Sequence, residues 1–92
     1  MRSRYYIEMT DTFGGEANYC WVNRFIVSAR TTRGAMRRVC TRTGDRASCS
    51  DRYNTPETWD SLTACIRYFV EWVDDDDIAR ITGNYSNVEV IK

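Results

Sequence analysis

The fold of this chain is decided by two segments, RYYIEMTDT (residues 4–12) and NYCWVNRFIVSA (residues 18–29). Both are rich in aromatic and β-branched residues, which favour strands. In the second segment, period-two spacing places four large side chains on one face: Tyr19, Trp21, Phe25 and Val27. Between the segments, FGGE (residues 13–16) contains paired glycines, which permit the positive φ of a tight turn. The sequence therefore predicts an antiparallel β-hairpin.

A helix is predicted after the hairpin, from Thr31 or Thr32 to about Thr43. Threonine is a favourable N-cap residue, and Gly44 fits the left-handed position at which many helices end. At helical spacing, one stripe of residues would lie on the sheet: Ala35, Met36, Val39, Cys40 and Thr43. The outer face of this helix would then be almost purely basic.

The second half of the chain predicts shorter elements. Residues 45–60 have the composition of a loop, with one short helical turn at residues 55–57. Residues 62–73 alternate as a third strand, whose core face would consist of Leu62, Ala64, Ile66, Tyr68, Val70 and Trp72. A short helix is expected at residues 78–82, because the aspartates before it suit a helix N-terminus, and a short last strand at residues 88–90.

These elements predict an α+β fold, a two-layer sandwich in which one Arg-rich helix packs on an antiparallel sheet of three to four strands. The element order is β-β-α-β with a short αβ tail. We expect residues 1–92 to form a single domain, because 42% apolar residues suffice for one compact core. The sheet face opposite the helix is expected to be partly exposed, as an aromatic patch bordered by arginine that suits a protein interface.

The charges are segregated along the chain, although Lys+Arg and Asp+Glu are equal at 13 each. Arginines crowd one segment: Arg30, Arg33, Arg37, Arg38, Arg42 and Arg46. Aspartates are consecutive in another: Asp74, Asp75, Asp76 and Asp77. We predict that a partner binds at one of these two poles. The candidate contact residues are all of the arginines and aspartates named above except Arg46.

Each pole has more than one interpretation. The basic helix face would bind an acidic protein or a nucleic acid, or it is a solvated face partly paired with the acidic pole. Net neutrality and the lack of aromatic residues between the arginines count against nucleic acid. The aspartates stabilise a helix N-terminus, mimic DNA or hold a cation, although a calcium loop normally alternates its ligands and contains a glycine turn. A third hypothesis is self-association, in which the basic helix of one copy meets the acidic run of another.

The sequence predicts no catalytic residue, no metal site and no cofactor, and the protein is not expected to be an enzyme. Histidine, the commonest general base, is absent. The four cysteines, Cys20, Cys40, Cys49 and Cys65, contain no C-x-x-C pair, so their spacing does not support a zinc site. Buried thiols in a reducing cytosol are expected, with a Cys40–Cys49 disulfide as the main alternative.

The chain is expected to be a soluble, cytoplasmic protein. Residues 1–6 contain two arginines, but the apolar region of a secretory signal does not follow them. No apolar run approaches the roughly 20 residues that span a bilayer.

The segment DTFGGEANYCWV (residues 11–22) resembles a stretch in small, largely uncharacterised proteins encoded by bacteriophages and prophages. In those proteins, as here, a helix follows and then an apolar strand that ends in FVEW, matched by residues 69–72. The resemblance covers about two-thirds of the chain, and residues 45–60 lie outside it. It implies a related fold and a phage origin, with Gly14, Gly15 and Trp21 as turn and core positions.

The shared residues carry no established activity. Small phage proteins of this size are often inhibitors of host machinery, anti-CRISPR proteins among them. By analogy, the resemblance implies a phage-encoded inhibitor that binds a host defence complex stoichiometrically in the host cytoplasm. A CRISPR effector subunit is one candidate partner. The alternative is a nucleic-acid-binding accessory protein that uses the Arg-rich helix.

Overall fold

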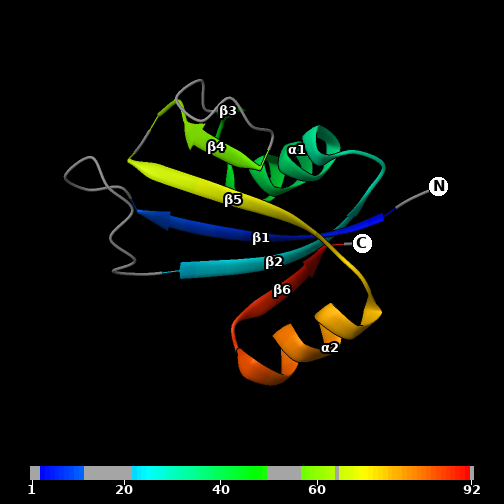
Figure 1. Ribbon diagram of the computed structural model, residues 1–92. Helices are drawn as coiled ribbons and strands as arrows, with labels where there is room; N and C mark the ends of the chain where they lie inside the picture. The colour runs from blue at the N-terminus through cyan, green and yellow to red at the C-terminus, as the bar shows by residue number, and fades with distance from the viewer. Residues whose placement is uncertain (1–2, 12–21, 50–56, 64, 92) are drawn as a thin grey trace.

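A six-stranded mixed sheet forms the centre of the computed structural model, which describes residues 3–11, 22–49, 57–63 and 65–91 (Figure 1). The strands lie in the order β3-β4-β5-β1-β2-β6. Their bounds are β1 (Ser3–Asp11), β2 (Val22–Ala29), β3 (Ala47–Cys49), β4 (Thr58–Ser61), β5 (Ile66–Val73) and β6 (Val88–Ile91). The helices of the described residues are α1 (Thr32–Thr43) and α2 (Asp75–Asn84).

The predicted two-layer sandwich, with one helix on three to four antiparallel strands, is wrong. β3 and all but the last residue of β4 form within residues 45–60, which were predicted as a loop, and the two strands extend the sheet beyond β5. β6 pairs with β2 in parallel, so the sheet is mixed, and α2 is a second helix packed against it. β3 has three residues and β4 has four, which is too short for a period-two pattern to be recognised.

The predicted hairpin is confirmed as the antiparallel pairing of β1 with β2. Its register places Tyr5 opposite Val27 and Ile7 opposite Phe25. β5 pairs with the other edge of β1, so β1 is hydrogen-bonded on both sides. The expected turn and the start of the second predicted strand fall in residues 12–21, outside the described part of the chain.

One face of the sheet carries α1 and the larger core cluster. α1 contributes three buried residues to it: Ala35, Met36 and Val39. The strand residues with no exposed surface are Ile7, Val27 and Tyr68. The predicted apolar stripe is therefore confirmed for its central residues. Cys40 is only half-buried, and Thr43 is exposed, so its predicted place in the core is wrong.

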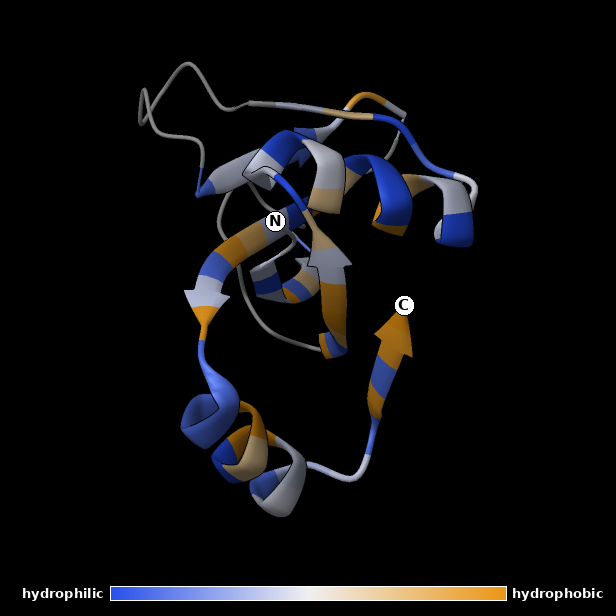
Figure 2. Cartoon of the chain, turned by 90° about the vertical axis from the view of Figure 1, so that its right-hand side faces the viewer, coloured by the Kyte–Doolittle hydropathy of each residue, from blue (hydrophilic) through white to orange (hydrophobic). Residues whose placement is uncertain are grey.

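The reverse face carries α2 over a second, smaller core cluster. Its buried members are Tyr6, Ile26, Val73 and Ile81. Side chains alternate between the two faces along each strand, so Tyr6 points away from Tyr5 and its neighbours in the larger cluster. The two helices consequently lie on opposite sides of the sheet (Figures 1 and 2). Phe69, on the same face as Tyr6, is half-buried.

The ends of α1 agree with the predicted capping residues. The Oγ1 atom of Thr31 accepts a hydrogen bond of 2.9 Å from the Gly34 amide, which satisfies one free donor of the first turn. Gly44 has φ 75°, and its N–H donates to the Cys40 carbonyl. Only glycine adopts this left-handed conformation at little cost, so the helix ends there.

α2 is longer than predicted, because the aspartates belong to it. It begins at Asp75, whereas the expected helix covered residues 78–82. The Asp74 carboxylate accepts from the Asp77 amide at 2.8 Å, and the Asp77 carboxylate accepts from the Asp74 amide at 3.3 Å. This capping box satisfies two backbone donors, and the negative charges suit the positive end of the helix.

Removal of this cap is expected to be measurable. Asp74→Ala should lower the free energy of unfolding by about 1 kcal/mol, the usual cost of losing an N-cap side chain. Urea denaturation followed by circular dichroism would measure it. Asp76→Ala is the matched control, since it removes the same charge from an exposed residue outside the capping box. Equal losses in the two variants would contradict the capping role.

β5 is shorter than predicted, and part of its expected core face is exposed. The strand begins at Ile66, not at Leu62. Tyr68 and Val70 are buried as predicted, but Leu62 is 64% exposed and Trp72 is 59% exposed. β4 pairs with β5 only as far as Phe69, so Trp72 extends beyond that neighbour. Tyr68, Val70 and Trp72 share one face as predicted, but periodicity did not show whether another element covers it. Leu62 lies outside β5, so its predicted place on this face is wrong, and Ala64 lies outside the described residues.

Candidate partner-binding groove

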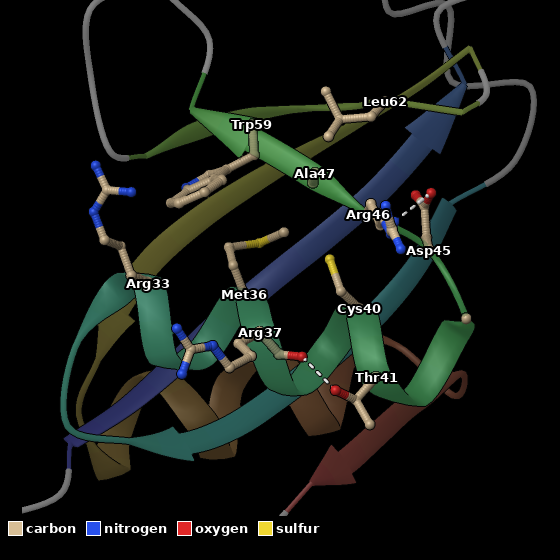
Figure 3. A pocket seen from close by; sticks show the side chains of 11 residues that line it. Arg33, Met36, Arg37, Cys40, Thr41, Asp45, Arg46, Ala47, Trp59 and Leu62 are labelled. Atoms are coloured by element: carbon tan, nitrogen blue, oxygen red, sulfur yellow. Dashed lines mark hydrogen bonds between the residues drawn. The ribbon is translucent and has the colours of Figure 1, made fainter.

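A groove of about 550 Å³ lies between α1 and the strands β3 and β4 (Figure 3). Its rim carries three guanidinium groups: Arg33, Arg37 and Arg46. Its floor and remaining wall are largely apolar: Met36, Cys40, Ala47, Trp59 and Leu62. We call this site the groove. It is larger than the acidic cavity of about 270 Å³ that is described below. Its mixture of cationic rim and apolar floor suits an anionic ligand with an apolar part.

Helical spacing places the two arginines of α1 on the groove. The apolar stripe of α1 is fixed on the sheet, and Arg33 and Arg37 are one turn apart beside it. Figure 3 shows both on the helix side, with Arg46 at the end where β3 begins. Arg46 immediately precedes β3, so the start of that strand sets its position.

The floor of the groove is part of the packed core. Trp59 is 5% exposed and Met36 is 2% exposed, and both belong to the larger core cluster. The Arg33 guanidinium carbon lies 5.5 Å from the centroid of the Trp59 ring, within cation–π range. Leu62 stands in contrast to this rigid floor, because it is an exposed aliphatic side chain on the β-strand side. A ligand would therefore gain apolar contact mainly from Leu62 and from half-buried Ala47 and Cys40, because Met36 and Trp59 expose little surface.

Asp45 contributes a carboxylate to the groove lining, but hydrogen bonds inside the protein occupy it. Its Oδ2 accepts from the Tyr68 hydroxyl at 2.6 Å. Its Oδ1 accepts from the hydroxyls of Ser61 and Thr63 and from the Arg46 amide. Burial alone would raise the pKa of Asp45, but these hydrogen bonds outweigh it and lower the pKa. Asp45 forms no ion pair with any described residue, and no described carboxylate forms an ion pair with Arg33, Arg37 or Arg46.

Cys40 is a free thiol in the groove, and so the alternative of a Cys40–Cys49 disulfide is not found. Burial raises the pKa of Cys40, and the negative charge of Asp45 raises it further. A thiol with a raised pKa stays protonated near neutral pH and is a poor nucleophile. Cys40 therefore acts as an apolar wall. Cys65 is a second free cysteine, exposed, while Cys20 and the side chain of Cys49 lie outside the description.

The predicted basic contacts divide into two groups. Arg38 donates to the Ser28 carbonyl at 2.7 Å, and Arg42 forms an ion pair of 2.6 Å with Glu89. These two arginines are engaged within the protein. The other three, Arg30, Arg33 and Arg37, form no ion pair with a described residue, and only the last two line the groove.

The predicted acidic contacts are mostly engaged as well. Asp74 caps α2, Asp75 pairs with Arg4 at 2.6 Å, and Asp77 pairs with Arg80 at 2.9 Å. Asp76 is exposed and forms no ion pair among the described residues. Because α2 lies on the face opposite α1, the aspartates and the groove are on different sides of the sheet. The structure therefore does not bring the two predicted poles together.

A smaller, acidic cavity of about 270 Å³ lies on the sheet face opposite the groove. Three carboxylates line it, those of Glu8, Glu57 and Glu71. The Tyr6 hydroxyl donates to Glu8 at 2.7 Å; burial, then this hydrogen bond, raises the pKa of Tyr6. The sheet thus separates a cationic concavity from an anionic one, although the whole chain is neutral.

Sequence reasoning missed the β-strand side of the groove. Trp59, Leu62 and Arg46 are not among the predicted contacts, because the sequence predicts a loop at residues 45–60 and a core position for Leu62. The Thr58-Trp59 pair, β-branched next to aromatic, was the available signal for a strand. Within the residues that the structure describes, no three His, Cys, Asp or Glu side chains are placed to hold a metal ion.

Comparison with protein-family models, curated proteins and solved structures finds no match to this chain. In the described ranges, neither the length nor the apolar character of any helix is sufficient for a membrane crossing. The functional argument consequently depends on the groove itself.

Proposed function

We propose that this protein acts by stoichiometric binding, without chemistry, to an acidic surface of a partner protein. The observation that carries the proposal is the pair Arg33 and Arg37, which line an apolar groove and have no ionic partner among the described residues. A partner carboxylate would gain a charge-assisted hydrogen bond to either guanidinium. The exposed Leu62 and half-buried Ala47 would add apolar contact area, and complementary charge would accelerate encounter.

The resemblance to small phage proteins extends the proposal to a biological setting. In that setting the protein is a phage-encoded inhibitor in the host cytoplasm, and the partner is a host defence complex, with a CRISPR effector subunit as one candidate. Only this partner class depends on the resemblance. The binding mode depends on the groove.

The composition of the groove favours a protein over a nucleic acid. Trp59 is 5% exposed, so its ring faces are not open for a base to stack on. The exposed aliphatic side chain in the wall, Leu62, complements an apolar residue and offers nothing to phosphate. Net charge is zero, whereas domains that bind nucleic acid usually carry excess positive charge.

Charge reversal inside the groove should weaken partner binding far more than the same change beside it. Arg37→Glu is expected to reduce affinity about thirtyfold, or about 2 kcal/mol, because an attractive contact becomes a repulsive one. Arg30→Glu is the matched control, since Arg30 is also exposed and forms no ion pair with a described residue but does not line the groove. We expect the control to lose less than about threefold, because screened charges at a distance contribute little.

The experiment first isolates the partner and then measures the interaction. Tagged protein would capture its partner from host lysate, and calorimetry with the purified partner would give affinity and stoichiometry for wild type and both variants. Equal losses in the two variants would exclude the groove as the docking site. Titration with duplex and single-stranded DNA at about 50 and 200 mM salt tests the alternative. Binding to DNA that is tighter than binding to the captured protein would favour the nucleic-acid function.

A further inference from the structure

We infer that the groove takes an extended peptide segment in which acidic residues alternate with apolar ones. This inference rests on the proposed function and names the shape and sequence pattern of the ligand. Three features of the groove support it: the spacing of its arginines, the position of its apolar floor and its length along α1.

The groove has the length of a short extended segment. Its lining follows α1 from Arg33 to Gly44 at the helix end. Eleven helical steps of about 1.5 Å give roughly 16 Å. An extended chain rises about 3.3 Å per residue, so about five residues span this distance. A helix of the same length would contain about eleven residues and would be about 10 Å wide, so it is the bulkier of the two occupants.

The spacing of the arginines matches every second residue of an extended chain. Arg33 and Arg37 are four residues apart, or about 6 Å along the helix axis. Residues i and i+2 of an extended chain are about 6.6 Å apart and point to the same side. Two carboxylates at alternate positions can therefore reach both guanidinium groups at once. Arg46 lies at the far end of the groove in Figure 3, where the last carboxylate of a five-residue segment would lie.

The intervening side chains point the other way, toward the apolar part of the groove. Met36 and Trp59 form a floor that is already packed, and Ala47 and Leu62 line the β-strand side. Figure 3 shows Met36, Trp59 and Ala47 between Arg33 and Arg46, with Leu62 at the edge of the β-strand side. An aliphatic side chain at each intervening position would lose water-exposed apolar surface there. The pattern that fits is therefore acidic, apolar, acidic, apolar, acidic.

Three peptides separate this pattern from charge and from composition. The test peptide contains Glu-Leu-Glu-Leu-Glu between Gly-Ser flanks. A scrambled peptide, Glu-Glu-Glu-Leu-Leu, keeps charge and composition but breaks the alternation. A third peptide, Glu-Ser-Glu-Ser-Glu, keeps the charges and their spacing but has no apolar side chains. Each is titrated into isotope-labelled full-length protein, and amide and indole NMR shifts report both the affinity and the site.

The alternating peptide is expected to bind at least about tenfold more tightly than either of the other two. Its shift changes should fall on α1, β3 and the Trp59 indole. Arg37→Glu should reduce its affinity about tenfold or more, while Arg30→Glu leaves it within about twofold. This combination of pattern preference, location and variant response supports the inference.

Other outcomes overturn the inference, and they distinguish it from the proposed function. Equal affinity for all three peptides would show that only charge is recognised. Shift changes outside the groove would assign the peptide to another surface. If no peptide binds but Arg37→Glu still weakens binding of the purified partner, the extended segment is rejected and the proposed function is kept. If the partner also binds Arg37→Glu with the affinity of the wild type, the groove is rejected as the binding site in both the proposed function and this inference. Tighter binding of single-stranded DNA at the groove would replace the peptide with a nucleic acid.

Discussion

Replacing Trp59 with alanine is expected to lower the free energy of unfolding by about 3–5 kcal/mol. Trp59 is 5% exposed, belongs to the larger core cluster and lies in β4, a strand of only four residues. Its truncation leaves a cavity between β4 and α1 that the surrounding side chains cannot fill completely. A chain of this size has a total stability of roughly 5–14 kcal/mol, so the variant would lose a large part of it.

Urea denaturation monitored by far-ultraviolet circular dichroism would measure this loss. Trp59→Phe should cost much less, since it retains an aromatic ring in the same cluster. Leu62→Ala is the control within the groove, because Leu62 is 64% exposed and its loss should change stability by less than about 0.5 kcal/mol. A loss below about 1 kcal/mol for Trp59→Ala would mean that the floor of the groove is not packed as described.

The second large effect is expected at Asp45. Asp45→Ala should lower the free energy of unfolding by about 2–4 kcal/mol. The variant loses the hydrogen bonds from Tyr68, Ser61, Thr63 and the Arg46 amide, and it leaves the hydroxyl of fully buried Tyr68 without this acceptor. Tyr68→Phe removes a single one of these bonds together with its donor, so its cost should be only about 1 kcal/mol. An equal loss of unfolding free energy in the two variants would show that the other hydrogen bonds to the Asp45 carboxylate contribute nothing to stability.

The same carboxylate predicts a pH dependence with a defined sign. Hydrogen bonding lowers the pKa of Asp45 in the folded state below its ordinary value of 3.8. The unfolded chain therefore binds a proton more readily at this residue, and acid favours unfolding. The resulting stabilisation is complete above the unfolded pKa and is lost as the pH falls through the folded pKa.

Stability measured from pH 7 to pH 2 in wild type and Asp45→Asn would test this dependence. The wild type should be more stable at pH 7, and the difference should shrink below about pH 4, where the wild-type carboxylate becomes protonated. The amide of the variant does not titrate, so it serves as the reference. A difference that stays constant over this range would exclude the proposed role of the Asp45 charge.

Local signals predicted the hairpin and α1 because their causes are close in the sequence. The Thr31 cap and the Gly44 end of α1 each act within one helical turn. The pattern of β1 and β2 extends over nine and eight residues, enough for period-two alternation to be clear. β3 and β4 are too short for such a pattern; β4 forms on the edge of β5, and β3 forms on the edge of β4. The sequence-based fold therefore lacked two strands and the groove that they border.

The sequence alone determined where cationic side chains occur and that α1 would present several of them outward. Only the tertiary structure decided which of them a partner can use. Arg42 and Arg37 are similar in sequence context, yet Arg42 meets Glu89 of β6 and Arg37 lines the groove. The physical reason is that an ion pair depends on distance in space, and the parallel docking of β6 beside β2 brings Glu89 within reach of α1.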